Sequence, residues 1–327
     1  MLNDFCSFQM KLNHFTMKRI SNIIHALFVM LVYTGAIAQT MAERLGYPAD
    51  AKLLIIHADD LGLSHSQNRA SITALENSPV NSASIMVPCP WFPEIAAYAR
   101  ENPAYDLGLH LTLTSEWKYF KWAPVSSKDS VLSLIDQNGY FYPSVPDVIM
   151  KAKPNEAELE MRNQIKMAYS QGIDVTHLDA HMGAAVSKLD LVVAYLKLGR
   201  EFGLPVLMDG RIHAMDDPVW KTLLDENTVV LDAIYTIEPA AYKSGSSKYY
   251  TELFQGLKPG LNALLIHLAY DDAEMQGVTV DHPEWGAAWR QADFDFFTSD
   301  ACKQILESNH IITVTWRELR DKVVRSN

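Results

Sequence analysis

The chain has 327 residues, of which 48% are hydrophobic and 20% are charged, and its 39 acidic residues outnumber 28 basic ones to give a net charge of −11. This length suits one α/β barrel, and the composition excludes a chain that is disordered throughout. The acidic balance argues against nucleic acid and anionic membranes as partners, because phosphate groups are bound by clustered lysine and arginine. A neutral or cationic ligand is expected.

Residues 1–38 have the pattern of a signal peptide for export. Lys18 and Arg19 precede an apolar stretch that closes with small residues at positions 35–38. The stretch is shorter than the ~20 residues needed to span a bilayer, so cleavage after Ala38 is favoured over a membrane anchor. A start at Met17 is left open. The protein is therefore expected to be periplasmic or secreted, with no stable membrane anchor.

Two cysteines lie outside this segment, Cys89 and Cys302, and they have no framework spacing. Export would permit a disulfide between them. A pair of buried free thiols is the alternative, and the sequence leaves both open.

Apolar, β-like runs alternate with helical patterns along residues 39–327, which are expected to form a single domain. Strands are predicted at 53–58, 83–87, 107–113, 175–178, 205–208, 229–233, 263–268 and 311–314. Helices are predicted at 67–76, 93–100, 156–171, 188–202, 249–255 and 292–307. This alternating order indicates an α/β fold with a mostly parallel sheet, closed or nearly closed as a barrel.

Two long insertions, at 114–153 and 269–291, interrupt this order. The first is rich in aromatic residues and proline, and the second carries acidic residues and tryptophans. Each follows a predicted strand that bears a histidine. Loops after the strands form the active-site face of a barrel, so these insertions should wall the site.

Two adjacent carboxylates, Asp59 and Asp60, follow the first predicted strand. Neighbouring residues on an extended strand point to opposite sides, so the two should have different roles, one binding a metal and the other facing substrate. The alternative is structural, because Asp-Asp-Leu-Gly could simply end the strand and cap the next helix.

Histidines recur at three later strands. His177, Asp179 and His181 are spaced by two, which places them on one face of an extended chain, and a metal site can use one imidazole as ligand while its neighbours orient it. His110 and His267 belong to two other predicted strands, and either one alone is more typical of an ordinary buried or surface histidine. Together with the adjacent carboxylates, these groups favour a metal-assisted hydrolase.

At these residues the chain resembles the YdjC-like carbohydrate deacetylases, the chitooligosaccharide deacetylase group related to the wider polysaccharide deacetylases. The resemblance covers roughly residues 53–319. It implies a distorted (β/α) barrel that removes acetyl groups from N-acetylated sugars or oligosaccharides with the help of one divalent metal ion, Mg²⁺ or Zn²⁺.

The same resemblance implies roles for individual residues. The metal ligands would be Asp60, His110 and His181. Asp59 would take a proton from the attacking water as the catalytic base, and His267 would protonate the departing amine as the general acid. Arg290 and Asp293 resemble an arginine and acidic pair that supports the site. His177 and Asp179 are expected to support it as well, from their spacing with His181 rather than from the resemblance.

Three positions depart from the family pattern. The third motif ends in Gly183 where many members have a second histidine, and the late histidine is followed by Leu268 and Ala269 rather than by Pro-Gly. The first motif begins with His57 where asparagine is frequent. All the implied ligands are present, so hydrolysis is still expected, whereas the identity of the sugar is not predicted.

Three aromatic residues of the first insertion, Trp117, Tyr119 and Trp122, could stack on sugar rings, although plain packing of a long loop would explain them equally well. Two other functions are left open: a metal-dependent esterase or phosphoesterase on the same barrel, and an exported glycan-binding protein with a decayed site. The expected partner is an acetylated mono- or oligosaccharide, and a homodimer is left open.

Overall fold

The computed structural model describes residues 39–210, 218–225 and 227–326. The predicted signal peptide, residues 1–38, lies outside the described residues. From Met41 onward the chain forms one compact unit. The two cysteines of this unit, Cys89 and Cys302, are buried free thiols.

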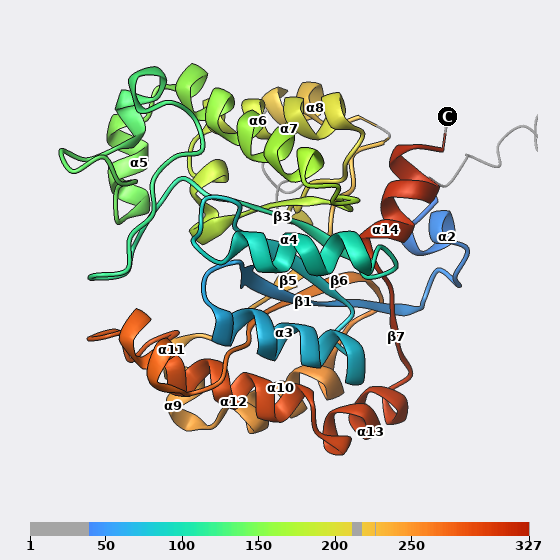
Figure 1. Cartoon of the computed structure of the whole chain (residues 1–327). Coiled ribbons are helices and arrows are strands. Elements are labelled where there is room, and N and C mark those ends of the chain that lie inside the picture. Colours follow the sequence, from blue (N-terminus) through green and yellow to red (C-terminus); the bar gives the residue numbers. More distant parts are fainter. Residues whose placement is uncertain (1–38, 211–217, 226, 327) are drawn as a thin grey trace, which may run out of the picture. The chain divides into compact units, whose positions relative to one another are not determined.

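A parallel sheet forms the centre of this unit (Figure 1). Its strands are β1 (Lys52–Leu61), β2 (Ser82–Ile85), β3 (Leu107–Leu111), β4 (Leu178–Ala180), β5 (Ala233–Tyr235), β6 (Gly260–His267) and β7 (Ile311–Thr313). Their order is β4-β3-β2-β1-β6-β5, and β7 pairs with the first residues of β1. Every pair is parallel, as the alternation of strands and helices predicts.

Backbone pairing continues past β4 and curls the sheet into a distorted (β/α) barrel. Leu178 bridges to Val206, and Asp209 bridges to Leu231. The predicted strands 205–208 and 229–233 are thus wrong in extent, because the structure reduces them to single bridges and places the regular strand β5 directly after them. Pro205 contributes to this difference, since proline has no N–H to add to a ladder. The predicted barrel is confirmed.

Helices cover the outside of the barrel (Figure 1). They are α2 (Met41–Leu45), α3 (His65–Asn77), α4 (Phe92–Glu101), α5 (Val145–Lys151), α6 (Pro154–Ser170), α7 (Leu189–Phe202), α8 (Pro218–Leu223), α9 (Pro239–Ser244), α10 (Ser246–Gly256), α11 (Ala273–Val278), α12 (Ala287–Phe297), α13 (Asp300–Ser308) and α14 (Trp316–Leu319). Within the described ranges, no helix has the length and apolar character needed to cross a membrane.

The single helix predicted at 292–307 is two helices, α12 and α13. The break comes at Ser299, whose hydroxyl accepts a hydrogen bond from the backbone N–H of Cys302 and so caps a new helix. The second insertion therefore contains α11 and the start of α12, which the sequence pattern did not predict.

Strand β1 divides the apolar core by simple alternation. Leu54 and Ile56 face the larger cluster, which includes the outer helices, whereas Leu53 and Ile55 face a smaller cluster that contains Trp316 of α14. Leu53 and Ile55 lie on the side of β1 that faces the barrel interior. The same side continues as His57 and Asp59, because alternate residues share one side of a strand. The barrel interior is therefore apolar where β1 begins and polar where β1 ends.

Gly108 of β3 leaves room for another buried polar group, the ring of His177. A Cβ at this position would lie 2.4 Å from the ring of His177. We expect Gly108→Ala to lower the free energy of unfolding by about 1–3 kcal/mol, because a packed interior does not absorb an added methyl group. Urea unfolding checks this, with Gly256→Ala as the matched control, since a Cβ at Gly256 meets nothing within 4 Å. Equal stability of the two variants would contradict the packing argument.

Candidate functional site

The carboxyl ends of the central strands bring the predicted polar groups together. In the β1–β6 pairing Asp59 lies opposite His267, and in the β3–β4 pairing His110 lies opposite Asp179. His181 comes directly after β4. Because all these strands are parallel, groups that are far apart in sequence meet at one end of the barrel.

Asp60, His110 and His181 converge on one point. Oδ1 of Asp60 lies 3.4 Å from Nε2 of His110 and 3.3 Å from Nδ1 of His181. All three residues are buried, and Oδ1 of Asp60 has no hydrogen-bond partner among the described residues. One carboxylate oxygen and two imidazole nitrogens at these separations are a donor set that suits a divalent ion. The convergence predicted from the sequence is therefore present.

The backbone at Asp60 departs from extended geometry. Its φ is 71°, in the left-handed region that few residues other than glycine, asparagine and aspartate adopt. As a result the carboxylates of Asp59 and Asp60 both come within 3.9 Å of Nε2 of His267. The expectation that the two side chains point to opposite sides is wrong, because the alternation ends at this residue. Such departures are typical of functional sites.

Arg290 of α12 fixes the other oxygen of Asp60. Its guanidinium lies 2.8 Å from Oδ2, and it also donates hydrogen bonds to the carbonyl of Trp285 and to the side chain of Gln67. Burial by itself would raise the pKa of the Asp60 carboxyl, but Arg290 and the two histidines hold it well below its usual range. Asp60 is therefore anionic, as a metal ligand must be.

Each of the two clustered imidazoles has a carboxylate at its other nitrogen. Nδ1 of His110 lies 2.7 Å from Oδ1 of Asp179, and Nε2 of His181 lies 3.0 Å from Oε2 of Glu116. Burial opposes the charging of His181, but Glu116 and Asp60 raise its pKa to about 9. Carboxylates in this position fix the orientation of metal-binding histidines and make them better donors.

Glu116 is the residue of this arrangement that sequence reasoning missed. It lies in the first insertion, where no strand or helix pattern singles out one side chain. The available signal was its position shortly after β3 in a segment expected to wall the site.

Two further residues that were predicted to support the site, His177 and Asp293, form hydrogen bonds to groups outside this cluster. His177 is buried, stacks on the ring of Trp316 and has its Nδ1 2.9 Å from the hydroxyl of Thr176. Asp293 accepts hydrogen bonds from the hydroxyl of Tyr250 and from the backbone N–H of His267. It thus supports the end of β6 rather than the imidazole of His267. Burial raises the pKa of Asp293 to about 7.

A cavity of about 580 Å³ opens over the cluster. The two insertions supply part of its wall, as predicted, with Glu116 and Trp117 from the first and His282, Glu284 and Trp285 from the second. Asp59, Asp60, His110, His181, His267 and Arg290 also line it.

The three aromatic residues proposed to stack on sugar lie in different places. Trp117 lines the cavity, whereas Trp122 is buried behind His181, where its indole N–H donates to the carbonyl of Thr114. Tyr119 is 73% exposed and does not line the cavity. Only Trp117 of the three is placed to contact a ligand in this cavity.

Comparison with known proteins shows the family of the chain. The family model described as "YdjC-like protein" matches residues 53–308. A carbohydrate deacetylase of Thermus thermophilus is 31% identical over 86% of this chain and 98% of its own length, and one of Thermoanaerobacter pseudethanolicus is 26% identical over 82% of this chain and 100% of its own length.

The solved structures include a similar fold. A proposed cellobiose-phosphate cleavage protein of Enterococcus faecalis matches with a TM-score of 0.69 and 24% identity, over 82% of this chain and 99% of that protein. The match supports the barrel fold and its connectivity. Because the family model matches most of the described chain and the Thermus thermophilus relative is 31% identical over 86% of this chain, the chain belongs to the YdjC-like family.

Proposed function

We propose that the protein is a metal-dependent carbohydrate deacetylase that removes acetyl groups from N-acetylated sugars or oligosaccharides. The observation that carries the proposal is the cluster of Asp60, His110 and His181 beside Asp59 at the floor of a cavity. The family relatives named carbohydrate deacetylase support the same activity. One divalent ion, Mg²⁺ or Zn²⁺, is the proposed cofactor.

Asp60, His110 and His181 would hold the ion. A divalent ion in such a site polarises a carbonyl oxygen and makes water a better nucleophile at neutral pH. The chain's contribution is to keep Asp60 anionic through Arg290 and to orient both rings through their carboxylate partners.

Asp59 is the proposed base. Oδ2 of Asp60 is paired with Arg290 and its Oδ1 lies at the two histidine nitrogens of the proposed ion site, whereas Oδ2 of Asp59 faces His267 at the cavity. Asp59 would take the proton from the attacking water, and His267 would give a proton to the amine nitrogen as the C–N bond breaks. Burial lowers the pKa of His267, which makes its protonated form a stronger acid.

Release of acetate tests the proposal. The purified protein is incubated with a panel of N- and O-acetylated mono- and oligosaccharides and with phosphorylated sugars, each with and without chelator. Acetate release that stops with chelator and returns with added ion is expected. Phosphate release would instead support a phosphoesterase, and sugar binding without turnover would support a glycan-binding protein.

The Glu116–His181 contact yields a further expected result. Glu116→Gln should weaken ion binding by about 10–100-fold, because the amide holds the imidazole less firmly and makes it a poorer donor. Glu284→Gln is the matched control, since Glu284 lines the same cavity but pairs with Lys243 rather than with a histidine. Isothermal titration with the ion measures both variants. An unchanged affinity for Glu116→Gln would remove Glu116 from the site.

A further inference from the structure

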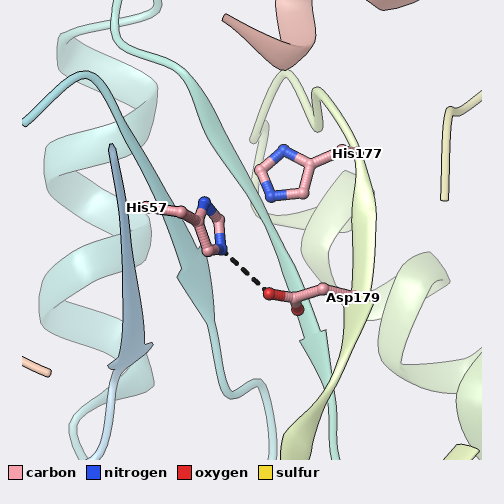
Figure 2. A group of neighbouring side chains, drawn as sticks. All are labelled: His57, His177 and Asp179. Atoms are coloured by element: carbon pink, nitrogen blue, oxygen red, sulfur yellow. Dashed lines mark hydrogen bonds and ion pairs between the residues drawn. The ribbon is translucent and has the colours of Figure 1, made fainter. Parts of the chain in front are cut away.

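His57 occupies the centre of a buried polar cluster below the cavity. It is fully buried on β1, and its Nε2 lies 2.9 Å from Oδ2 of Asp179 and 3.2 Å from Oδ1 of Asp59. Figure 2 shows the ring of His57 directed toward the Asp179 carboxylate across the intervening strands, with His177 alongside. No part of the proposed mechanism so far uses His57.

The position of a proton on His57 follows from its neighbours. An ionised carboxylate can only accept hydrogen bonds, so Nε2 must carry the hydrogen that it donates to Asp179, and Asp59 meets the same nitrogen as an ion pair. Nδ1 lies 2.9 Å from the hydroxyl of Ser82, which can accept from it. Burial alone would lower the pKa of His57, but its contacts with Asp179 and Asp59 raise it to about 9. The ring thus lies buried between two carboxylates.

His57 connects the proposed base to a proposed metal ligand. Asp179 uses Oδ2 for His57 and Oδ1 for Nδ1 of His110. A continuous series of contacts therefore runs from Asp59 through His57 and Asp179 to His110. We propose that His57 is a positioning residue that holds the Asp59 carboxylate in place for proton transfer and keeps Asp179 aligned on His110. The proposal rests on the deacetylase function proposed above.

A second interpretation of this region is a metal site formed by His57, His177 and Asp179, whose ligand atoms lie within 4.8 Å of one another. The contacts favour a hydrogen-bonded bridge instead. Oδ2 of Asp179 already accepts from His57 and from the hydroxyl of Ser84. The ring of His177 meets that of His57 edge-on at 4.9 Å. A second ion would have to displace the hydrogen bonds of Asp179, and among the three donors only Nε2 of His177 has no hydrogen-bond partner within the described residues.

Two amide substitutions at His57 separate positioning from packing. The side-chain nitrogen of glutamine reaches about as far as Nε2 of histidine, whereas that of asparagine reaches only as far as Nδ1. His57→Asn should therefore lower kcat by about 10–100-fold at saturating ion with KM unchanged, and His57→Gln should restore most of the lost kcat. Equal losses in the two variants, or a loss that appears in KM, would overturn the proposal.

A double-mutant cycle with Asp59→Asn identifies the residue through which His57 acts. If His57 works by holding Asp59, the loss of about 10–100-fold caused by His57→Asn should shrink to about 1–3-fold when Asp59 is already asparagine. Equal losses in both backgrounds would mean that His57 acts elsewhere. Should His57→Asn fail to fold, as judged by circular dichroism, His57→Gln alone tests the proposal: near-parental kcat is expected, and a large loss of kcat overturns it.

Ion stoichiometry supplies a readout apart from activity. One ion per chain is expected for both the parent protein and His57→Asn. Two ions in the parent and one in the variant would show a second metal site and overturn the bridge. A parent protein that releases no acetate would defeat the proposed function, whereas an active parent with an additive cycle would defeat only the role of His57.

Discussion

Asp59→Asn is expected to lower kcat for acetate release by about 10²–10⁴-fold while the protein still binds its ion, because the substitution removes a general base without removing a ligand. Asp60→Asn is expected to weaken ion binding as well. The two residues are adjacent, yet their surroundings differ: Asp60 faces two imidazole nitrogens and Arg290, and Asp59 faces His57 and His267.

Steady-state kinetics and isothermal titration with the ion, performed on both variants, measure this division of labour. Asp272→Asn is a suitable control, because Asp272 caps α11 and does not line the cavity. Loss of ion from Asp59→Asn, or full turnover in either site variant, would contradict the assignment of base and ligand.

The second large effect concerns the leaving group. His267→Ala should damage hydrolysis of an N-acetyl sugar far more than hydrolysis of an activated aryl acetate, because an amine leaves only after protonation and a phenolate leaves without it. The loss on the N-acetyl substrate should approach about 10²–10⁴-fold. His267 lies at the end of β6, lines the cavity and has its Nε2 facing both carboxylates.

The ratio of the two losses is the diagnostic quantity, and kcat/KM on each substrate provides it. His65→Ala serves as control, since His65 pairs with Glu94 on the surface of α3 and α4. Equal losses on both substrates would mean that His267 acts on the ion, the water or the fold, and the role of general acid would have to move to another residue.

Much of this site could be predicted because its residues lie on or directly after strands that the hydrophobic pattern predicts. Asp60, His110 and His181 each follow or lie on an apolar run, and parallel strands bring such positions to one end of a barrel. The reversal at Asp60 could not be predicted in the same way. Its left-handed backbone is held by contacts with Arg290 and the histidines, which come from distant segments of the chain.

The elements that differ from prediction share a physical cause. Hydrophobic periodicity identifies regular segments, but it does not show where a hydroxyl such as that of Ser299 starts a new helix, or where strands near Val206 and Leu231 pair through single bridges. Glu116 lacks any periodic context, so its approach to His181 depends on the path of the insertion. Export through residues 1–38 stays a prediction.

Titration of ion-free protein with its ion, read out as acetate release from an N-acetylated disaccharide, tests the central claim most directly. The account predicts that ion-free protein is inactive, that activity rises linearly with added Mg²⁺ or Zn²⁺ and that it levels off at one equivalent per chain, with Asp60→Asn inactive at the same ion concentrations. Acetate release that is independent of the ion, or an absence of acetate at every ion concentration, would contradict it.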